Sequence, residues 1–125
     1  MRVGVVADSH VGEHLRALPD EVLALLRGVD LILHAGDLST ADVILALEGV
    51  APVVAVRGNH DDAVPGLPRD VVVRVGGRRI GLTHGARPAV VELTAAALSV
   101  LAGRPVTLGF SRAMRARFGA IDCLV

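Results

Sequence analysis

A chain of 125 residues is long enough to bury a core, and we predict a single domain over residues 1–125. Hydrophobic residues make up 52% of the sequence and aromatic residues 2%, which excludes a disordered chain and a base-stacking platform for nucleic acids. The net charge is zero, and no apolar run reaches the ~20 residues that a membrane span needs. Because the amino terminus lacks a signal-peptide pattern and the single cysteine excludes an internal disulfide, we expect a cytoplasmic protein.

Charge is unevenly distributed along the sequence. Residues 1–62 hold ten acidic residues and four arginines, whereas residues 63–125 hold three acidic residues and nine arginines. An acidic first half suits bound cations, and a basic second half suits an anionic substrate. Two solvated faces are the plainer explanation of the same pattern.

The first half of the sequence alternates strand-like and helix-like patterns. Mostly apolar runs predict buried strands, while a proline followed by acidic residues, or a Ser-Thr-Ala-Asp capping box, predicts the start of a helix. The predicted strands are residues 2–7, 30–34 and 52–56, and the predicted helices are residues 19–27 and 39–48. This β-α-β-α-β order predicts right-handed crossovers and a parallel sheet.

Side chains that bind metals follow each predicted strand. Asp8 and His10 follow the first strand, Asp37 follows the second, and Asn59 follows the third. Because the carboxyl ends of parallel strands share one edge of a sheet, we expect these side chains to meet there. Taken singly, each motif is also typical of a polar turn or a surface histidine.

A hairpin is predicted after the third strand. Its arms are residues 70–75 and 78–83, and Gly76-Gly77 forms the turn between them. If the second arm runs parallel to the earlier strands, its carboxyl end brings His84 to the same edge of the sheet.

The last third of the chain carries two predicted helices and an apolar end. Residues 89–101 are apolar almost all round, so this helix is expected to be buried or to meet a partner, a second copy of the chain included. Residues 111–118 predict another helix, and residues 120–125 predict a strand-like run.

The candidate ligands together form a mixed set of oxygen and nitrogen donors. They are Asp8, His10, Asp37, Asn59 and His84. Because the set contains no thiolate, it suits Mn²⁺, Fe or Zn²⁺ in a reactive site rather than a structural zinc. His60 is a candidate to protonate a leaving group or to stabilise a charged transition state. The spacing predicts a metal site but does not name the reaction.

Four motifs, in this order, resemble one enzyme family. They are Asp8-Ser9-His10, Gly36-Asp37, Gly58-Asn59-His60-Asp61 and His84-Gly85. The sequence is similar to the calcineurin-like metallophosphoesterases, above all to the small bacterial and archaeal YfcE-like phosphodiesterases, and the similarity spans nearly the whole chain. The resemblance implies an α/β fold in which two sheets and their flanking helices form an α/β/β/α sandwich.

The resemblance also implies a site for two divalent metal ions. Asp8 and His10 would bind one ion, Asn59 and His84 would bind the other, and Asp37 would bridge them. Mn²⁺ is the expected metal, with Fe, Zn²⁺ and Ni²⁺ as alternatives.

Four further residues are given roles beside the metal ligands, and the role of His60 is the one that the resemblance implies. A metal-bridging hydroxide would attack phosphorus while His60, the implied catalytic residue, assists departure of the alcohol. Many close relatives carry Cys at this position, so the histidine favours the fuller phosphatase-type machinery. Arg57, Asp61 and His34 are assigned to positions behind the ligands or against the substrate.

The sequence departs from the family pattern at its end. The family continues with a Gly-His-x-His loop, which supplies one more ligand to each metal, and with the closing strands of the second sheet. This chain ends at Val125. We therefore expect either a C-terminally truncated domain with part of its second sheet missing, or a protein that has lost two ligands.

Two functions of different classes follow from the sequence. The first is a metal-dependent phosphoesterase that hydrolyses phosphodiesters or phosphomonoesters, with a small phosphate ester as substrate and no nucleic-acid or membrane partner. The alternative is a non-catalytic interaction scaffold of the same fold, with residues 89–101 and the uncovered sheet as partner surfaces. A nucleotide-binding domain is disfavoured because no Gly-rich phosphate loop follows the first strand.

Overall fold

The computed structural model describes residues 1–85, 99–101 and 116–125. The chain divides into two compact units, Gly85–Gly119 and a larger unit made of Met1–His84 with Ala120–Val125. The predicted helices 89–101 and 111–118 lie largely outside the described residues, although residues 99–101 and 116–118 are helical. The prediction of one domain over the whole chain stays a prediction.

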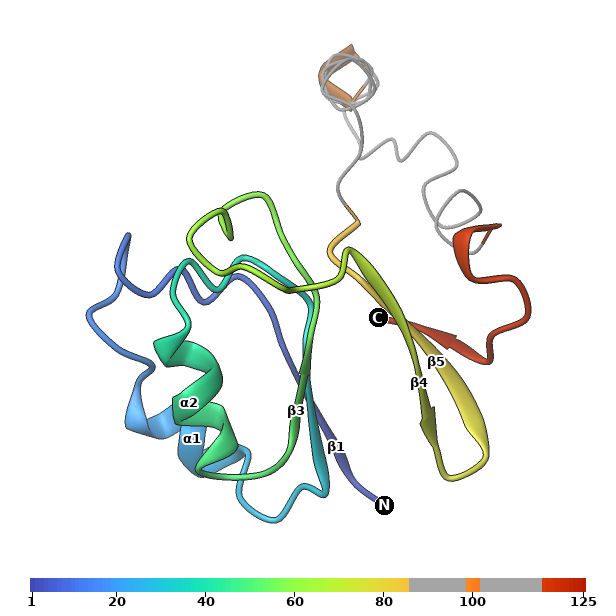
Figure 1. Ribbon diagram of the computed structural model, residues 1–125, viewed down its shortest axis with the longest axis horizontal. Coiled ribbons are helices and arrows are strands. Elements are labelled where there is room, and N and C mark those ends of the chain that lie inside the picture. The colour runs from blue at the N-terminus through green and yellow to red at the C-terminus, as the bar shows by residue number, and fades with distance from the viewer. Residues whose placement is uncertain (86–98, 102–115) are drawn as a thin grey trace. The chain divides into compact units, whose positions relative to one another are not determined.

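All named strands and helices belong to the larger unit (Figure 1). They are β1 (Val3–Val6), α1 (Asp20–Leu25), β2 (Leu31–His34), α2 (Asp42–Glu48), β3 (Val53–Ala55), β4 (Asp70–Val75), β5 (Arg78–Thr83) and β6 (Cys123–Leu124). The predicted order of strands and helices up to residue 83, and the presence of two sheets, are confirmed. None of the helices in the described part of the chain is long and apolar enough to cross a membrane.

The first sheet is parallel and has the order β1-β2-β3. Alternation along β2 divides the core into two layers, as period-two side chains require. Ile32 packs with residues of α1 and α2, which lie together on one face of the sheet, whereas Leu31 and Leu33 pack on the opposite face (Figure 1). The loops that follow the three strands therefore lie at one end of a buried sheet.

The second sheet has the order β4-β5-β6. β4 and β5 form the predicted hairpin, and both turn glycines, Gly76 and Gly77, have a left-handed backbone. β6 pairs in parallel with β5. Because Leu31 and Leu33 share a hydrophobic cluster with Leu82 of β5, the two sheets pack face to face. The hairpin thus belongs to a sheet of its own and does not extend the first one.

The predicted capping box at residues 39–42 is wrong. Helix α2 begins after Ala41, whose side chain cannot cap, and no side-chain hydrogen bond caps its amino end. Ser39 instead has a left-handed backbone with a φ of 67°. Its amide donates to the buried carboxylate of Asp61, so a contact from a distant part of the chain overrides the local capping pattern.

Candidate functional site

The loops after β1 and β2 run side by side through backbone hydrogen bonds. The amide of Asp8 donates to the carbonyl of Gly36 at 3.0 Å, and the amide of His10 donates to the carbonyl of Asp37 at 3.0 Å. The amide of Val11 continues the series to Leu38 at 3.1 Å. This pairing extends the strand register beyond the sheet and brings the first three predicted ligands to one place.

Four residues in these two loops have a backbone conformation that L-amino acids rarely adopt. Their φ angles are 53° at Asp8, 43° at His10, 58° at Asp37 and 67° at Ser39, and among the described residues no other non-glycine has a positive φ. Such conformations cost free energy and persist only where the surroundings enforce them. Three of the four are predicted metal ligands, so the strain is concentrated in the candidate site.

Two glycines allow three loops to come this close. A Cβ at Gly58 would overlap both the carboxylate and the backbone nitrogen of Asp37. A Cβ at Gly36 would lie 2.8 Å from the nitrogen of Gly58 and 2.9 Å from the Cβ of His84, and its φ is 96°. Both positions therefore require glycine for close approach of the backbone.

Asp61 holds the loops after β2 and β3 together. Its side chain is buried, and its two carboxylate oxygens accept hydrogen bonds from the backbone amides of Asp37, Leu38, Ser39 and Gly58, at 2.7 to 2.9 Å. Burial raises the pKa of this carboxyl, but the four amide donors outweigh burial and hold its pKa below the ordinary value of 3.8. These contacts fix the loop that carries Asp37, and the assignment of Asp61 to a position behind the ligands or against the substrate stays a prediction.

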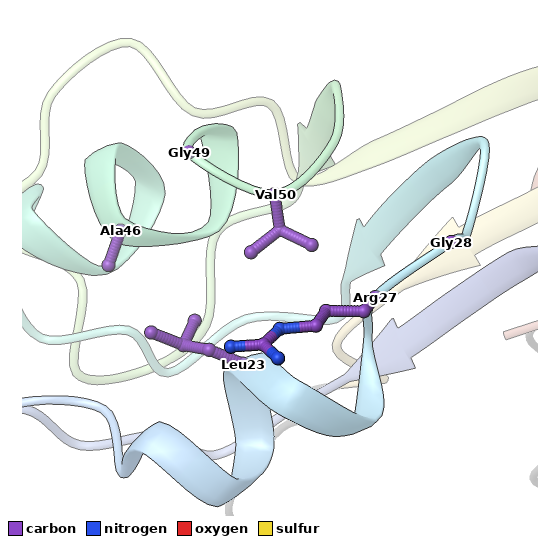
Figure 2. Close-up of a pocket in the computed structure, with 6 residues that line it drawn as sticks. All are labelled: Leu23, Arg27, Gly28, Ala46, Gly49 and Val50. Carbon is purple, nitrogen blue, oxygen red and sulfur yellow. The ribbon is translucent and has the colours of Figure 1, made fainter.

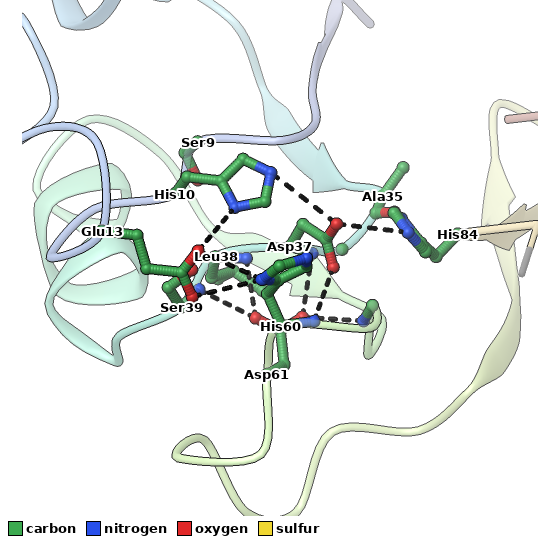
Figure 3. Close-up of polar contacts among 12 residues, drawn as sticks. Ser9, His10, Glu13, Ala35, Asp37, Leu38, Ser39, His60, Asp61 and His84 are labelled. Carbon is green, nitrogen blue, oxygen red and sulfur yellow. Dashed lines mark hydrogen bonds and ion pairs between the residues drawn. The ribbon is translucent and has the colours of Figure 1, made fainter.

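The carboxylate of Asp37 lies at the centre of the site (Figure 3). Its Oδ1 accepts a hydrogen bond of 2.9 Å from the amide of His60. Its Oδ2 lies 3.7 Å from Nε2 of His10 and 3.4 Å from Nε2 of His84. One oxygen is thus fixed by the backbone, and the other faces imidazoles from two different sheets.

The tautomer of His84 follows from its second ring nitrogen. Nδ1 lies 2.9 Å from the carbonyl oxygen of Ala35, and because a carbonyl can only accept, Nδ1 carries the hydrogen. In the neutral ring Nε2 then turns a lone pair toward the carboxylate of Asp37, which is unfavourable unless a cation lies between them. A backbone carbonyl that orients a histidine in this way is typical of metal ligands.

The donor set therefore fits a divalent metal. Asp8, His10 and Asp37 each offer a ligand atom within 4.8 Å of the others. Carboxylate oxygen and imidazole nitrogen together suit Mn²⁺, Fe or Zn²⁺. Asn59 lies in the same loop, between Gly58 and His60, and its side chain is exposed. Whether its amide joins the donor set stays a prediction.

His34 lies behind the site, and its side chain is buried. Nδ1 accepts the amide hydrogen of Gly36 at 3.2 Å, so Nε2 carries the ring hydrogen and donates it to the hydroxyl of Ser9 at 2.8 Å. Burial lowers the pKa of His34 to about 4, against an ordinary value of 6.5. A neutral imidazole thus connects the loops after β1 and β2.

Arg57 points to a different partner. Its guanidinium pairs with the carboxylate of Asp62, both side chains are substantially exposed, and its backbone amide donates to Pro68 at 2.7 Å. These contacts lie beside the loop after β3. A role of Arg57 toward substrate stays a prediction.

Glu13 contacts the candidate site and was not predicted from the sequence. Its Oε2 lies 3.1 Å from Nδ1 of His60 and 3.5 Å from Nδ1 of His10. Partial burial raises the pKa of Glu13, but Ser39 and the imidazoles of His60 and His10 outweigh it and lower that pKa below its ordinary value. The only signal in the sequence is an acidic residue three positions after His10, which is too common to single out.

A separate hollow of about 400 Å³ lies between α1 and α2 (Figure 2). It is lined by Leu23, Arg27, Gly28, Ala46, Gly49 and Val50. This lining offers one cationic side chain and no carboxylate or imidazole, so it lacks the donors that a metal or a proton transfer requires. The chemistry-bearing residues are those around Asp37.

Comparison with known proteins agrees with this geometry. The family model described as the calcineurin-like phosphoesterase superfamily domain matches residues 1–111. The chain is 40% identical over 87 residues to a probable metallophosphoesterase of Methanothermobacter thermautotrophicus, a match that covers 68% of this chain and 50% of the relative. The chain spans about half the length of the curated relatives it matches.

Two solved structures have the same fold. Vps29 from Entamoeba histolytica, solved in complex with Zn²⁺, matches with a TM-score of 0.71 and 24% identity, over 99% of this chain and 62% of its own. A structure described as a novel archaeal phosphodiesterase matches with a TM-score of 0.56 and 21% identity, over 78% of this chain and 67% of its own. Because the family model covers well over half of the sequence, the chain belongs to the calcineurin-like phosphoesterase superfamily.

Proposed function

We propose that this protein is a metal-dependent phosphoesterase that hydrolyses phosphodiesters. The observation that carries the proposal is the position of Asp37, whose Oδ2 faces Nε2 of His10 and Nε2 of His84 at 3.7 and 3.4 Å. A carboxylate oxygen between two ring nitrogens, one of which turns its lone pair toward it, suits a bridge between cations. The family to which the chain belongs, and its relatives named as probable metallophosphoesterases, support the same role.

The ligands divide by loop. Asp8 and His10 would hold one divalent ion, Asn59 and His84 the other, with Asp37 shared, and Mn²⁺ is the metal we propose. Bound ions would supply Lewis-acid activation of the phosphoryl group and of the attacking water. Asp61 would keep Asp37 in place through its amide contacts.

His60 would serve as the proton donor to the leaving oxygen. Its side chain is half exposed, so a substrate can reach it, and its backbone amide is fixed by Oδ1 of Asp37. Because Nδ1 faces Glu13, Nε2 is the nitrogen that remains for the substrate. A positioned histidine of this kind contributes about 10²–10⁴-fold to a rate.

The test is hydrolysis of bis-p-nitrophenyl phosphate with added Mn²⁺. We expect turnover that a chelator removes and that Asp37→Asn abolishes, whereas Asp20→Asn, a change at the exposed start of α1, leaves it intact. The assay is run on this chain and on any longer product of the gene. Absence of metal-dependent turnover in all of them would refute the proposal.

A second candidate is a non-catalytic scaffold. It is favoured by the fold shared with Vps29 and by two exposed leucines, Leu25 at 84% and Leu45 at 66% exposure, on the helices that flank the first sheet. Calorimetric titration with Mn²⁺ and Zn²⁺, combined with the hydrolysis assay, separates the two candidates. A folded chain that binds metal or not but shows no turnover supports the scaffold, and metal-dependent turnover that Asp37→Asn removes supports the phosphoesterase.

A further inference from the structure

We propose that Glu13 is a positioning residue for His60, and this inference rests on the proposed phosphoesterase function. The carboxylate of Glu13 holds the imidazole of His60 through Nδ1 and thereby sets the orientation of the proton donor. Neither residue belongs to the predicted set of metal ligands, although Glu13 also offers a ligand atom within 4.8 Å of those of His10 and His14. Glu13 lies in the segment that follows β1, whereas His60 lies in the loop after β3.

The contact involves both oxygens of the carboxylate. Oε1 lies 3.3 Å and Oε2 lies 3.1 Å from Nδ1 of His60. Oε2 also lies 3.5 Å from Nδ1 of His10, and the rings of His10 and His60 meet edge to face with their centres 4.9 Å apart. Glu13 therefore sits against a predicted ligand and the predicted proton donor at once (Figure 3).

A fixed turn delivers Glu13 to this place. The carbonyl of His10 accepts the backbone amides of Glu13 at 3.2 Å and His14 at 3.0 Å, and the amide of Gly12 donates to Leu15 at 2.7 Å. Gly12 has a φ of 95°, which lets the chain reverse here. The turn is thus tied to His10 itself, and the carboxylate is presented beside the metal-binding loops.

The chemical consequence concerns the tautomer of His60. A carboxylate only accepts, so Nδ1 of His60 carries a hydrogen in the neutral ring as well as in the protonated ring, and the proton that passes to the leaving oxygen is the second one, bound at Nε2 of the protonated ring. His60 is half exposed and Glu13 is 38% exposed, and ion pairs in such positions add little to stability. The contact therefore serves orientation of the imidazole rather than stability of the fold.

The experiment compares Glu13→Gln and Glu13→Asp with the control Glu21→Gln, an exposed acidic residue in the first turn of α1. Heteronuclear NMR of the imidazole nitrogens, assigned with His60→Gln, reports the tautomer of His60 in the metal-free chain and with Zn²⁺. We expect Nδ1–H in the wild type and in Glu21→Gln. In Glu13→Gln we expect a mixture of both tautomers, and Glu13→Asp should restore part of the wild-type signal.

Kinetics supply the second measurement. If His60 protonates the leaving group, its misplacement should harm poor leaving groups most, because good ones depart without a proton. We expect Glu13→Gln to slow hydrolysis of a phenyl phosphodiester at least about 10-fold more than that of the p-nitrophenyl analogue, with KM little changed. Equal slowing of both substrates together with an unchanged tautomer would overturn the inference.

The two measurements keep the proposals separable. If neither this chain nor a longer product of the gene hydrolyses either substrate, the proposed function fails, and the tautomer alone then decides whether Glu13 holds His60. If the wild type is active and Glu13→Gln leaves both the tautomer and the leaving-group dependence unchanged, the function stands and the role of Glu13 is refuted.

Discussion

Asp61 is the residue on which the geometry of the site depends most. Four backbone amides donate to one buried carboxylate, and three of them belong to the loop that carries Asp37. Asp61→Asn replaces one acceptor oxygen by a donor that opposes these amides. We expect a loss of about 3 kcal/mol in the free energy of unfolding, measured with urea, and weaker Mn²⁺ binding.

The adjacent Asp62 supplies the control for this prediction. Its side chain is 88% exposed and pairs only at the surface, so Asp62→Asn should cost less than about 1 kcal/mol. Because the folded-state pKa of Asp61 is lowered, its contribution is present above pH 3.8 and is lost as the pH falls through the folded-state pKa. Equal stability losses in the two variants would contradict the assignment.

His34 should also make the free energy of unfolding depend on pH, here because the folded state favours the neutral form of the side chain and not the charged one. Its pKa is about 4 in the folded state and 6.5 in the unfolded chain, so the unfolded chain binds the extra proton first. The free energy of unfolding should therefore fall by up to about 3 kcal/mol as the pH drops from 6.5 to about 4, when a chelator is present to keep the site free of metal. The measurement is urea unfolding across this range, and His34→Gln should lose this part of the slope. An unchanged slope in that variant would show that His34 is not its source.

At the scale of the elements, the site depends on close contacts between loops that only glycine permits. Gly58→Ala places a methyl group on Asp37, and we expect about 1–3 kcal/mol of destabilisation with a clear loss of Mn²⁺ affinity by calorimetry. The matched control is Gly66→Ala, where φ is 86° but no atom lies within 4 Å of the new Cβ. That variant should lose about 1–2 kcal/mol through backbone strain and keep its metal affinity. If both variants bind Mn²⁺ equally well, close packing on Asp37 is not what the site requires.

The strands were the most predictable elements. Alternation and turn chemistry are local properties, and the hairpin arms 70–75 and 78–83 were predicted with the bounds of β4 and β5. The capping pattern at residues 39–42 failed because Ser39 is bound by Asp61, 22 positions later in the chain. Local rules cannot anticipate a competitor that arrives from another loop.

At the scale of the whole molecule, the site draws on both sheets. Asp8, His10 and Asp37 follow strands of the first sheet, whereas His84 follows β5 of the second. Strand order alone could gather the first group along one edge. The approach of His84 depends on the packing of the two sheets, whose residues Leu33 and Leu82 share one hydrophobic cluster. The resemblance implied the two-sheet sandwich, but no local pattern contains it. Glu13 was missed for a related reason, because its meaning appears only once His60 lies beside it.

The short strand β6 has a consequence for how the second sheet meets other molecules. Cys123 and Leu124 pair with Ile80 and Gly81, so part of the outer row of peptide groups on β5 is already occupied. Where such a row of peptide groups is unpaired, a strand from another molecule can form hydrogen bonds with it. Cys123 and Leu124 therefore leave fewer peptide groups of β5 open to a strand of a neighbouring chain, while in the order β4-β5-β6 the strand β4 forms the other edge of the sheet.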